Sequence, residues 1–187
     1  MRLRPTDLLI LFAVGAAGGL IGDAGNVQSG ATRYIDDSAP FVWESPLWFP
    51  ALVGAATVAI GVVRLWLGAP RPGFDARIGV AAFASVVAIY SVTSVAGDDG
   101  TPAVALVVSL GVLVACAFAD RPGLICGVAA AVIGPPVEIA IVELDLSEYA
   151  DSHDSLFGVG LWLPGLYLAF GVAAARIAEL LVARRTG

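Results

Sequence analysis

Hydrophobic residues are concentrated in six long runs that are separated by short polar segments. The runs are Leu8–Ile21, Leu47–Leu67, Ile78–Val95, Ala103–Ala117, Gly123–Val142 and Leu156–Ala175. Most of them approach the ~20 residues that a helix needs to cross the hydrocarbon core of a bilayer. The pattern therefore predicts an all-α integral membrane protein, a compact bundle of six transmembrane helices, with spans at about 6–22, 47–67, 78–96, 102–118, 122–142 and 155–182.

The charges between the runs alternate in sign and indicate which end of the bundle faces the cytosol. Nine of the ten arginines fall in the two termini, at the end of the second run, or in the segments after the second and fourth runs, and only Arg33 falls elsewhere. The other segments are acidic, for example Glu143, Asp145 and Glu148 after the fifth run. Because cytosolic segments of membrane proteins are rich in arginine and lysine, we expect both termini to be cytosolic.

Composition supports the membrane interpretation. Of the 187 residues, 58% are hydrophobic and only 14% are charged, which is too little polar surface to cover a soluble globule. Six spans also use most of the chain, so we expect one domain over residues 1–187. The net charge of −6 is carried by the external segments and argues against a nucleic-acid partner.

The first run has a second interpretation, because a basic start followed by a short apolar stretch is also typical of a secretory signal peptide. The run ends in Gly22-Asp23-Ala24-Gly25 without a clean small-x-small cleavage site. We therefore expect residues 1–22 to be retained as the first span. Cleavage would leave five spans.

Glu138 is the ionisable residue that the sequence places deep inside a span, directly after Gly134-Pro135-Pro136. A charged, lipid-facing carboxylate there would cost several kcal/mol, so Glu138 must face the bundle interior. The two prolines remove amide donors, which predicts a kinked or locally open fifth helix beside a cavity. Three roles remain open for Glu138: a structural hydrogen bond, an anchor for a ligand headgroup, or a proton-coupling site.

A cavity beside this helix would suit an apolar molecule with a small uncharged head. We expect Glu138 and nearby hydroxyls to orient the head and apolar walls to hold the tails. The candidate ligand-binding residues are Glu138, Pro135, Pro136, Tyr90, Ser94, Trp48 and Trp162.

Catalytic and metal-binding motifs are missing from the sequence. Asp151-Ser152-His153-Asp154 contains the single histidine, but no second histidine or thiolate accompanies it. No nucleophile elbow, phosphate-binding glycine loop or paired-histidine motif is present. We therefore expect a protein that is not an enzyme and that needs neither a metal nor a cofactor.

Three short motifs occur in an order that resembles the INSIG family. They are Leu47-Trp48-Phe49-Pro50 opening the second span, Phe118-Ala119-Asp120-Arg121 with Gly123-Leu124 in the turn before the fifth, and Leu161-Trp162-Leu163-Pro164 before the last helix. The likeness runs from about Trp43 to Arg185. The resemblance implies a six-span, non-enzymatic lipid sensor.

Eukaryotic INSIG proteins bind oxysterols within the bundle and retain sterol-sensing-domain proteins, and their aspartate in the cytosolic turn matters for partner function. The resemblance thus implies a partner-binding role for Asp120 and its neighbour Arg121, whereas the alternative from the residues alone is a charged turn cap. Ten arginines without lysine favour a bacterial chain, and hence a bacterial plasma membrane and a diacylglycerol-like or sterol-like neutral lipid in place of an oxysterol. The small-residue helix faces are compatible with a homo-oligomer as well as with a monomer. The alternative function is a small proton-coupled transporter that uses Glu138.

Overall fold

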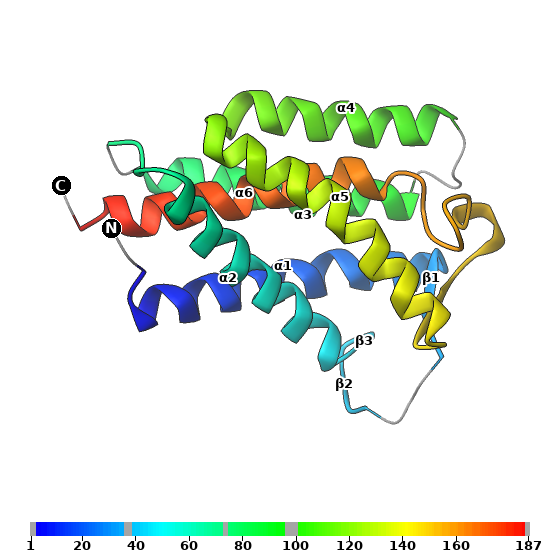
Figure 1. The fold of residues 1–187 in the computed structure, drawn as a ribbon. Coiled ribbons are helices and arrows are strands. Elements are labelled where there is room, and N and C mark those ends of the chain that lie inside the picture. Colours follow the sequence, from blue (N-terminus) through cyan, green and yellow to red (C-terminus); the bar gives the residue numbers. More distant parts are fainter. Residues whose placement is uncertain (1–2, 36–38, 73–74, 96–100, 186–187) are drawn as a thin grey trace.

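The computed structural model describes residues 3–35, 39–72, 75–95 and 101–185. As predicted, the fold is a bundle of long helices (Figure 1). The helices are α1 (Pro5–Ser29), α2 (Trp48–Leu67), α3 (Ala76–Val95), α4 (Thr101–Phe118), α5 (Arg121–Glu143) and α6 (Leu163–Ala183). Short strands lie in the connections: β1 (Thr32–Tyr34), β2 (Phe41–Val42), β3 (Ser45–Pro46) and β4 (Ser147–Tyr149), with a 3-10 turn η1 (Asp151–His153).

The helices have the length and composition of membrane spans. Five of the described helices are long and apolar enough to cross a membrane, and α4 is an apolar helix of slightly shorter length. Both chain ends lie at the same end of the bundle, whereas β1 lies at the opposite end (Figure 1). An even number of helices places the termini together, which is the arrangement that the arginine pattern requires.

Helix α6 is the centre of the bundle and packs against all five other helices. Its close packing depends on small residues. A Cβ atom on Gly165 would lie 2.8 Å from Val108 Cα of α4, and one on Gly171 would lie 2.7 Å from the carbonyl oxygen of Cys126 in α5. Glycine at these positions lets the helix backbones approach closely, as in other membrane bundles.

Helix α1 continues to Ser29, beyond the expected end of the span at residue 22. It ends at Gly30, whose φ of 77° is left-handed and whose amide donates to the carbonyl of Val27 at the helix end. Gly22, Asp23 and Asn26 are buried on the same face as the earlier glycines, at the three- and four-residue spacing of a helix. The extension carries polar side chains into the bundle.

Helix α6 begins at Leu163, later than the expected start at 155. Phe157 and Gly158 both have left-handed backbone conformations, with φ values of 53° and 86°, and Leu156 bridges to Val159. This turn reverses the chain before Pro164, which occupies a favourable place in the first helical turn.

A small antiparallel sheet closes the end of the bundle that lies away from the termini. Strand β1 follows α1, and β4 follows α5, so the pairing joins the two connections. Thr32 lies opposite Tyr149, and Tyr34 opposite Ser147. The sheet is called the outer sheet below.

Helix α5 remains helical through Pro135 and Pro136, where we expected a kinked or locally open helix. Pro135 is buried and Pro136 is exposed. Each proline lacks the amide that would bond to the carbonyl one turn earlier, so the helix loses two internal hydrogen bonds there without ending.

Candidate functional site

Glu138 lies near the C-terminal end of α5, close to the outer sheet, and accepts hydrogen bonds from two tyrosine hydroxyls. The Tyr167 hydroxyl of α6 donates to Oε1 at 2.7 Å, and the Tyr149 hydroxyl of the outer sheet lies 3.4 Å from Oε2. The carboxyl group is therefore directed into the bundle, as expected because a charged carboxylate that faces lipid is energetically costly.

A second carboxyl group, Asp23 of α1, is buried in the same region with 3% of its surface exposed. Its Oδ2 atom accepts hydrogen bonds from the Tyr34 hydroxyl, at 2.7 Å, and from the Ser45 hydroxyl. Tyr90 of α3 packs against Gly22, where a Cβ atom would lie 1.9 Å from its ring, and also interacts with Asp23. Asp23 and Glu138 thus form one polar cluster with the surrounding hydroxyls.

The phenols of the outer sheet keep their protons. Burial, followed by the charge of Asp23, raises the pKa of Tyr34 far above its ordinary value. Burial, followed by the charge of Glu138, raises the pKa of Tyr149 in the same direction. Both side chains therefore act as hydrogen-bond donors to the carboxyl groups at physiological pH.

A cavity of about 380 Å³ lies in the middle of the bundle, and Glu138 is at one end of it. Its walls come from α1, α2, α3, α5 and α6 and are almost entirely apolar. Polar side chains on the wall are Thr57, Tyr90, Cys126, Glu138 and Tyr167. The volume and lining are those of a site for an apolar small molecule with a few polar contacts.

Several cavity-lining residues are also exposed on the outside of the bundle, and they belong to α2 and α5. Leu52 and Val63 of α2 are exposed, as are Ile133 and Val137 of α5. These two helices make few contacts with each other. The cavity therefore opens to the surroundings between α2 and α5, at the level of their apolar residues.

The other residues that we expected at a ligand site take different positions. Trp48 lies beside a smaller recess that also contains Asp23 and Glu138, but not on the main cavity. Trp162 is buried in the core with its ring centre 6.3 Å from that of Tyr149. Pro135 and Pro136 are not among the cavity-lining residues, and the Ser94 hydroxyl donates to the carbonyl of Ser91.

The bundle buries more ionisable side chains than the one we expected. At the end that carries the termini, Arg64 of α2 is 0% exposed and Glu179 of α6 is 1% exposed, and the two form an ion pair. Arg71 and Arg176 contact the same carboxylate at 2.7 Å and 3.1 Å. At the same end, Asp7 of α1 pairs with arginines of the chain terminus. Charged groups tie α2, α6 and the α2–α3 connection together.

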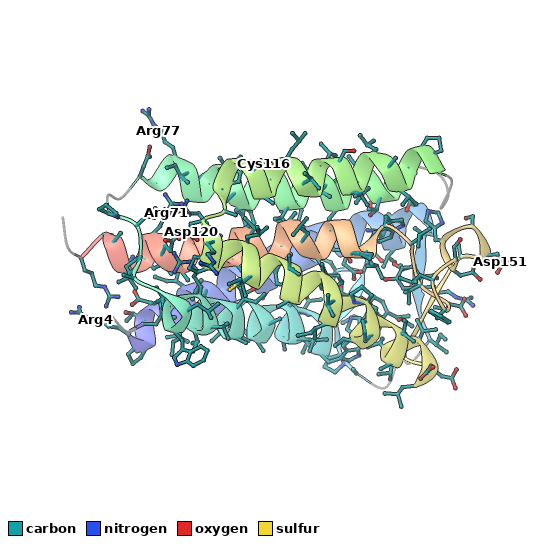
Figure 2. The ribbon with its side chains drawn as sticks, turned by 45° about the horizontal axis from the view of Figure 1, so that its top comes forward. Arg4, Arg71, Arg77, Cys116, Asp120 and Asp151 are labelled. Atoms are coloured by element: carbon teal, nitrogen blue, oxygen red, sulfur yellow. The ribbon has the colours of Figure 1, made fainter. Side chains whose placement is uncertain are left out.

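Asp120 belongs to this network. Its Oδ1 atom accepts the amide of Gly123 at 2.8 Å and caps α5, and its Oδ2 atom lies 2.5 Å from Arg64. Figure 2 shows Asp120 and Arg71 together near the end with the termini, with Asp151 at the far end. Arg121, the next residue, is exposed.

Of the residues expected at a ligand site, Glu138 and Tyr90 line the cavity, whereas the expectation did not include Asp23, Tyr34 or the residues of the outer sheet. The hydropathy of the first run ends at Ile21, which placed Asp23 in an external segment. A signal was present in the spacing of Gly15, Gly19, Gly22 and Asn26, which continues one helix face past the apolar run. Nothing in the sequence pairs β1 with β4.

Comparison with known proteins identifies relatives over nearly the whole chain. No family model matches it. The chain is 48% identical over 186 residues to the INSIG protein homolog of Mycolicibacterium vanbaalenii, a match that covers 99% of this chain and 91% of that protein. The crystal structure of the mycobacterial Insig homolog MvINS from Mycobacterium vanbaalenii superimposes with a TM-score of 0.95 at 48% identity, covering 99% of this chain and 98% of the other. A cross-linked trimer of a MvINS variant is similar to the same degree, with a TM-score of 0.95, 47% identity and the same coverage of both chains.

This relationship does not favour the alternative of a proton-coupled transporter. An identity of 48% sustained over almost the full length, together with the same arrangement of membrane helices, shows that this chain belongs to the INSIG family.

Proposed function

We propose that this protein is a non-enzymatic membrane sensor that holds one neutral lipid, diacylglycerol-like or sterol-like, in its central cavity. The observation that carries the proposal is the cavity of about 380 Å³, apolar along its walls and polar only at a few positions such as Glu138. The opening between α2 and α5 gives a lipid a path from the bilayer.

The charge at the outer end of the cavity favours a neutral head. Asp23 and Glu138 both carry carboxyl groups, and among the described residues their hydrogen-bond donors are hydroxyls rather than cations. An anionic phospholipid would meet repulsion there. A head with hydroxyl groups can instead hydrogen-bond to the cluster without bringing an unpaired charge into the bundle.

The test is native mass spectrometry of the detergent-purified protein, followed by identification of the extracted lipid. We expect one neutral lipid per chain, and we expect Glu138→Gln to weaken its retention. A purified protein that retains no lipid, or retains anionic phospholipids only, would contradict the proposal.

A pair of neighbouring substitutions separates cavity binding from lipid on the outer surface. Ala56 lines the cavity, so Ala56→Trp fills it and should abolish retention. Ala55 is exposed on α2 and does not line the cavity, so Ala55→Trp should leave retention unchanged. Equal retention by the two variants would place the lipid outside the cavity.

The membrane, the orientation and the oligomeric state are a further part of the proposal. We propose a homo-oligomer in a bacterial plasma membrane, with both termini in the cytosol; the cross-linked trimer of the MvINS variant supports the oligomer. Membrane-embedded cross-linking of the full chain should yield a discrete oligomer band. A ladder of increasing size would indicate random collision.

The cytosolic turn remains our proposed contact for a protein partner. The Asp120 carboxylate already pairs with Arg64 and accepts the Gly123 amide at the start of α5, so we expect it to stabilise the conformation of the turn. The exposed Arg121 can contact the partner directly. Arg121→Gln should therefore weaken partner binding at unchanged stability, whereas Asp120→Asn should lower both. Co-purification and thermal unfolding measured on the same two variants distinguish these roles.

A further inference from the structure

We propose that the small polar recess beneath the outer sheet is a seat for a single hydroxyl group of the bound lipid, and that Thr32 is the residue that makes the site selective for it. The inference rests on the proposed lipid-binding function and specifies the chemistry of the ligand's head.

The recess adjoins the main cavity. Its volume is about 20 Å³, which is room for one water-sized group. The residues on its wall that carry a carboxyl or hydroxyl group are Asp23, Thr32, Tyr34, Tyr90, Glu138, Ser147 and Tyr149. It shares Phe49, Tyr90 and Glu138 with the main cavity, so a head that passes Tyr90 and Glu138 enters the recess while the tails stay among apolar side chains.

The alternation of the outer sheet aims hydroxyls into the recess. Thr32 and Tyr34 share one face of β1, and Ser147 and Tyr149 share the corresponding face of β4. The residues between them point the other way, and there the Arg33 Nε donates to Glu148 at 2.7 Å on the exposed face. The sheet therefore covers the recess with four hydroxyl-bearing side chains.

Counting donors and acceptors shows what kind of group the recess accepts. Tyr34 and Ser45 already donate to Asp23, with which Tyr90 also interacts, and Tyr149 and Tyr167 donate to Glu138. The Thr32 hydroxyl differs: it is buried and has no hydrogen-bond partner among the residues that the structure describes. The wall thus combines carboxyl oxygens that accept with one unpaired hydroxyl that needs a partner.

A hydroxyl group on the ligand matches this wall because it can donate to a carboxyl oxygen and accept from Thr32. An ether or ester oxygen only accepts, so it would face the carboxyl oxygens without a hydrogen to share. An ammonium group can pair with the carboxyl oxygens, but it only donates, so the Thr32 hydroxyl would have no acceptor for its hydrogen. A site built to bond a hydroxyl rejects analogues without one, because buried polar groups are then left unpaired.

The experiment compares three probes with identical tails in binding to the purified full chain: dioleoylglycerol, its methyl ether, and the analogue with an amine in place of the hydroxyl. We expect the alcohol to bind about tenfold more tightly than the ether. The amine tests whether the charge of the carboxyl groups, rather than the Thr32 hydroxyl, selects the head. Thr32→Val keeps the side-chain shape and removes the hydroxyl, so it should bring the alcohol and the ether to similar affinity, whereas Thr32→Ser should retain the preference.

Thr57→Val is the matched control. Thr57 lies on the main cavity, but its hydroxyl donates to the carbonyl of Val53 at 2.8 Å, so the preference for the alcohol should survive. Asp23→Asn, which keeps the volume and loses an acceptor, should also reduce the preference and provides a second variant if Thr32→Val does not fold.

The outcomes separate the seat from the lipid-binding function itself. Equal binding of the alcohol and the ether by the natural protein, a preference for the amine, or an unchanged preference in both Thr32→Val and Asp23→Asn would overturn the hydroxyl seat and leave lipid binding in place. Failure of all three probes to bind would overturn the proposed function together with the inference.

Discussion

The ion pair between Glu179 and Arg64 predicts a large loss of stability when the carboxylate is neutralised. Arg64 is 0% exposed and Glu179 is 1% exposed, and the same carboxylate contacts Arg71 and Arg176. Glu179→Gln preserves the size of the side chain but leaves the buried Arg64 with Asp120 as its remaining carboxylate. Removing one partner of a buried ion pair costs about 3–5 kcal/mol.

We expect the lower end of that range, about 3 kcal/mol, because Asp120 stays 2.5 Å from Arg64 and the glutamine oxygen still accepts a hydrogen bond. This loss reduces the ratio of folded to unfolded protein by roughly two orders of magnitude. The free energy of unfolding would be measured in mixed micelles with a denaturing detergent, with tryptophan fluorescence as the probe.

The control is Glu143→Gln, at an exposed position at the end of α5, where the change should stay within about 0.5 kcal/mol. A double-mutant cycle with Arg64→Met should show coupling, because the two side chains are in direct contact. If Glu179→Gln and Glu143→Gln cost the same, or if the cycle shows no coupling, the ion pairs of Glu179 do not stabilise the fold.

Three further predictions test the packing and the polar cluster. Gly165→Ala should lower the free energy of unfolding by about 1–3 kcal/mol, because its Cβ would lie 2.8 Å from the Val108 backbone. Gly79→Ala should cost less, because its Cβ would contact only the flexible end of Leu180 at 3.2 Å. Equal costs would contradict the packing argument. Tyr167→Phe removes a 2.7 Å hydrogen bond to Glu138 and should lower the free energy of unfolding by about 1 kcal/mol. Tyr149→Phe should have a smaller effect, because its hydrogen bond is 3.4 Å long. The reverse order would argue against the assigned bonds. The pKa of Tyr34 is raised in the folded protein, so the unfolded chain loses this proton first as pH increases, and the free energy of unfolding should fall above about pH 10. Phenolate absorbance from all four tyrosines at that pH, without unfolding, would refute the assignment of Tyr34 as a buried donor.

The candidate site was only partly predictable because its members come from distant parts of the chain. Glu138 could be identified since a carboxyl group inside an apolar run is costly and must face the interior. Asp23 could not, because hydropathy ends the first run before it, and its partners Tyr34 and Ser45 lie 11 and 22 residues away across a turn and two strands. Asp120 shows the same limit: the sequence suggested a turn cap, which it is, but not its contact with Arg64, 56 residues away.

The sequence by itself determined that this is a helical membrane protein and that nine of its ten arginines group at one end. These properties depend on summed transfer energies and on the distribution of charge along the chain, and both can be read from residue order alone. Only the tertiary structure decided that Asp23 joins Glu138, that the outer sheet covers their hydroxyl cluster, and that the central cavity opens between α2 and α5. Those features depend on which side chains meet across helices, and the close approaches at Gly165 and Gly171 that set the helix positions are invisible to hydropathy.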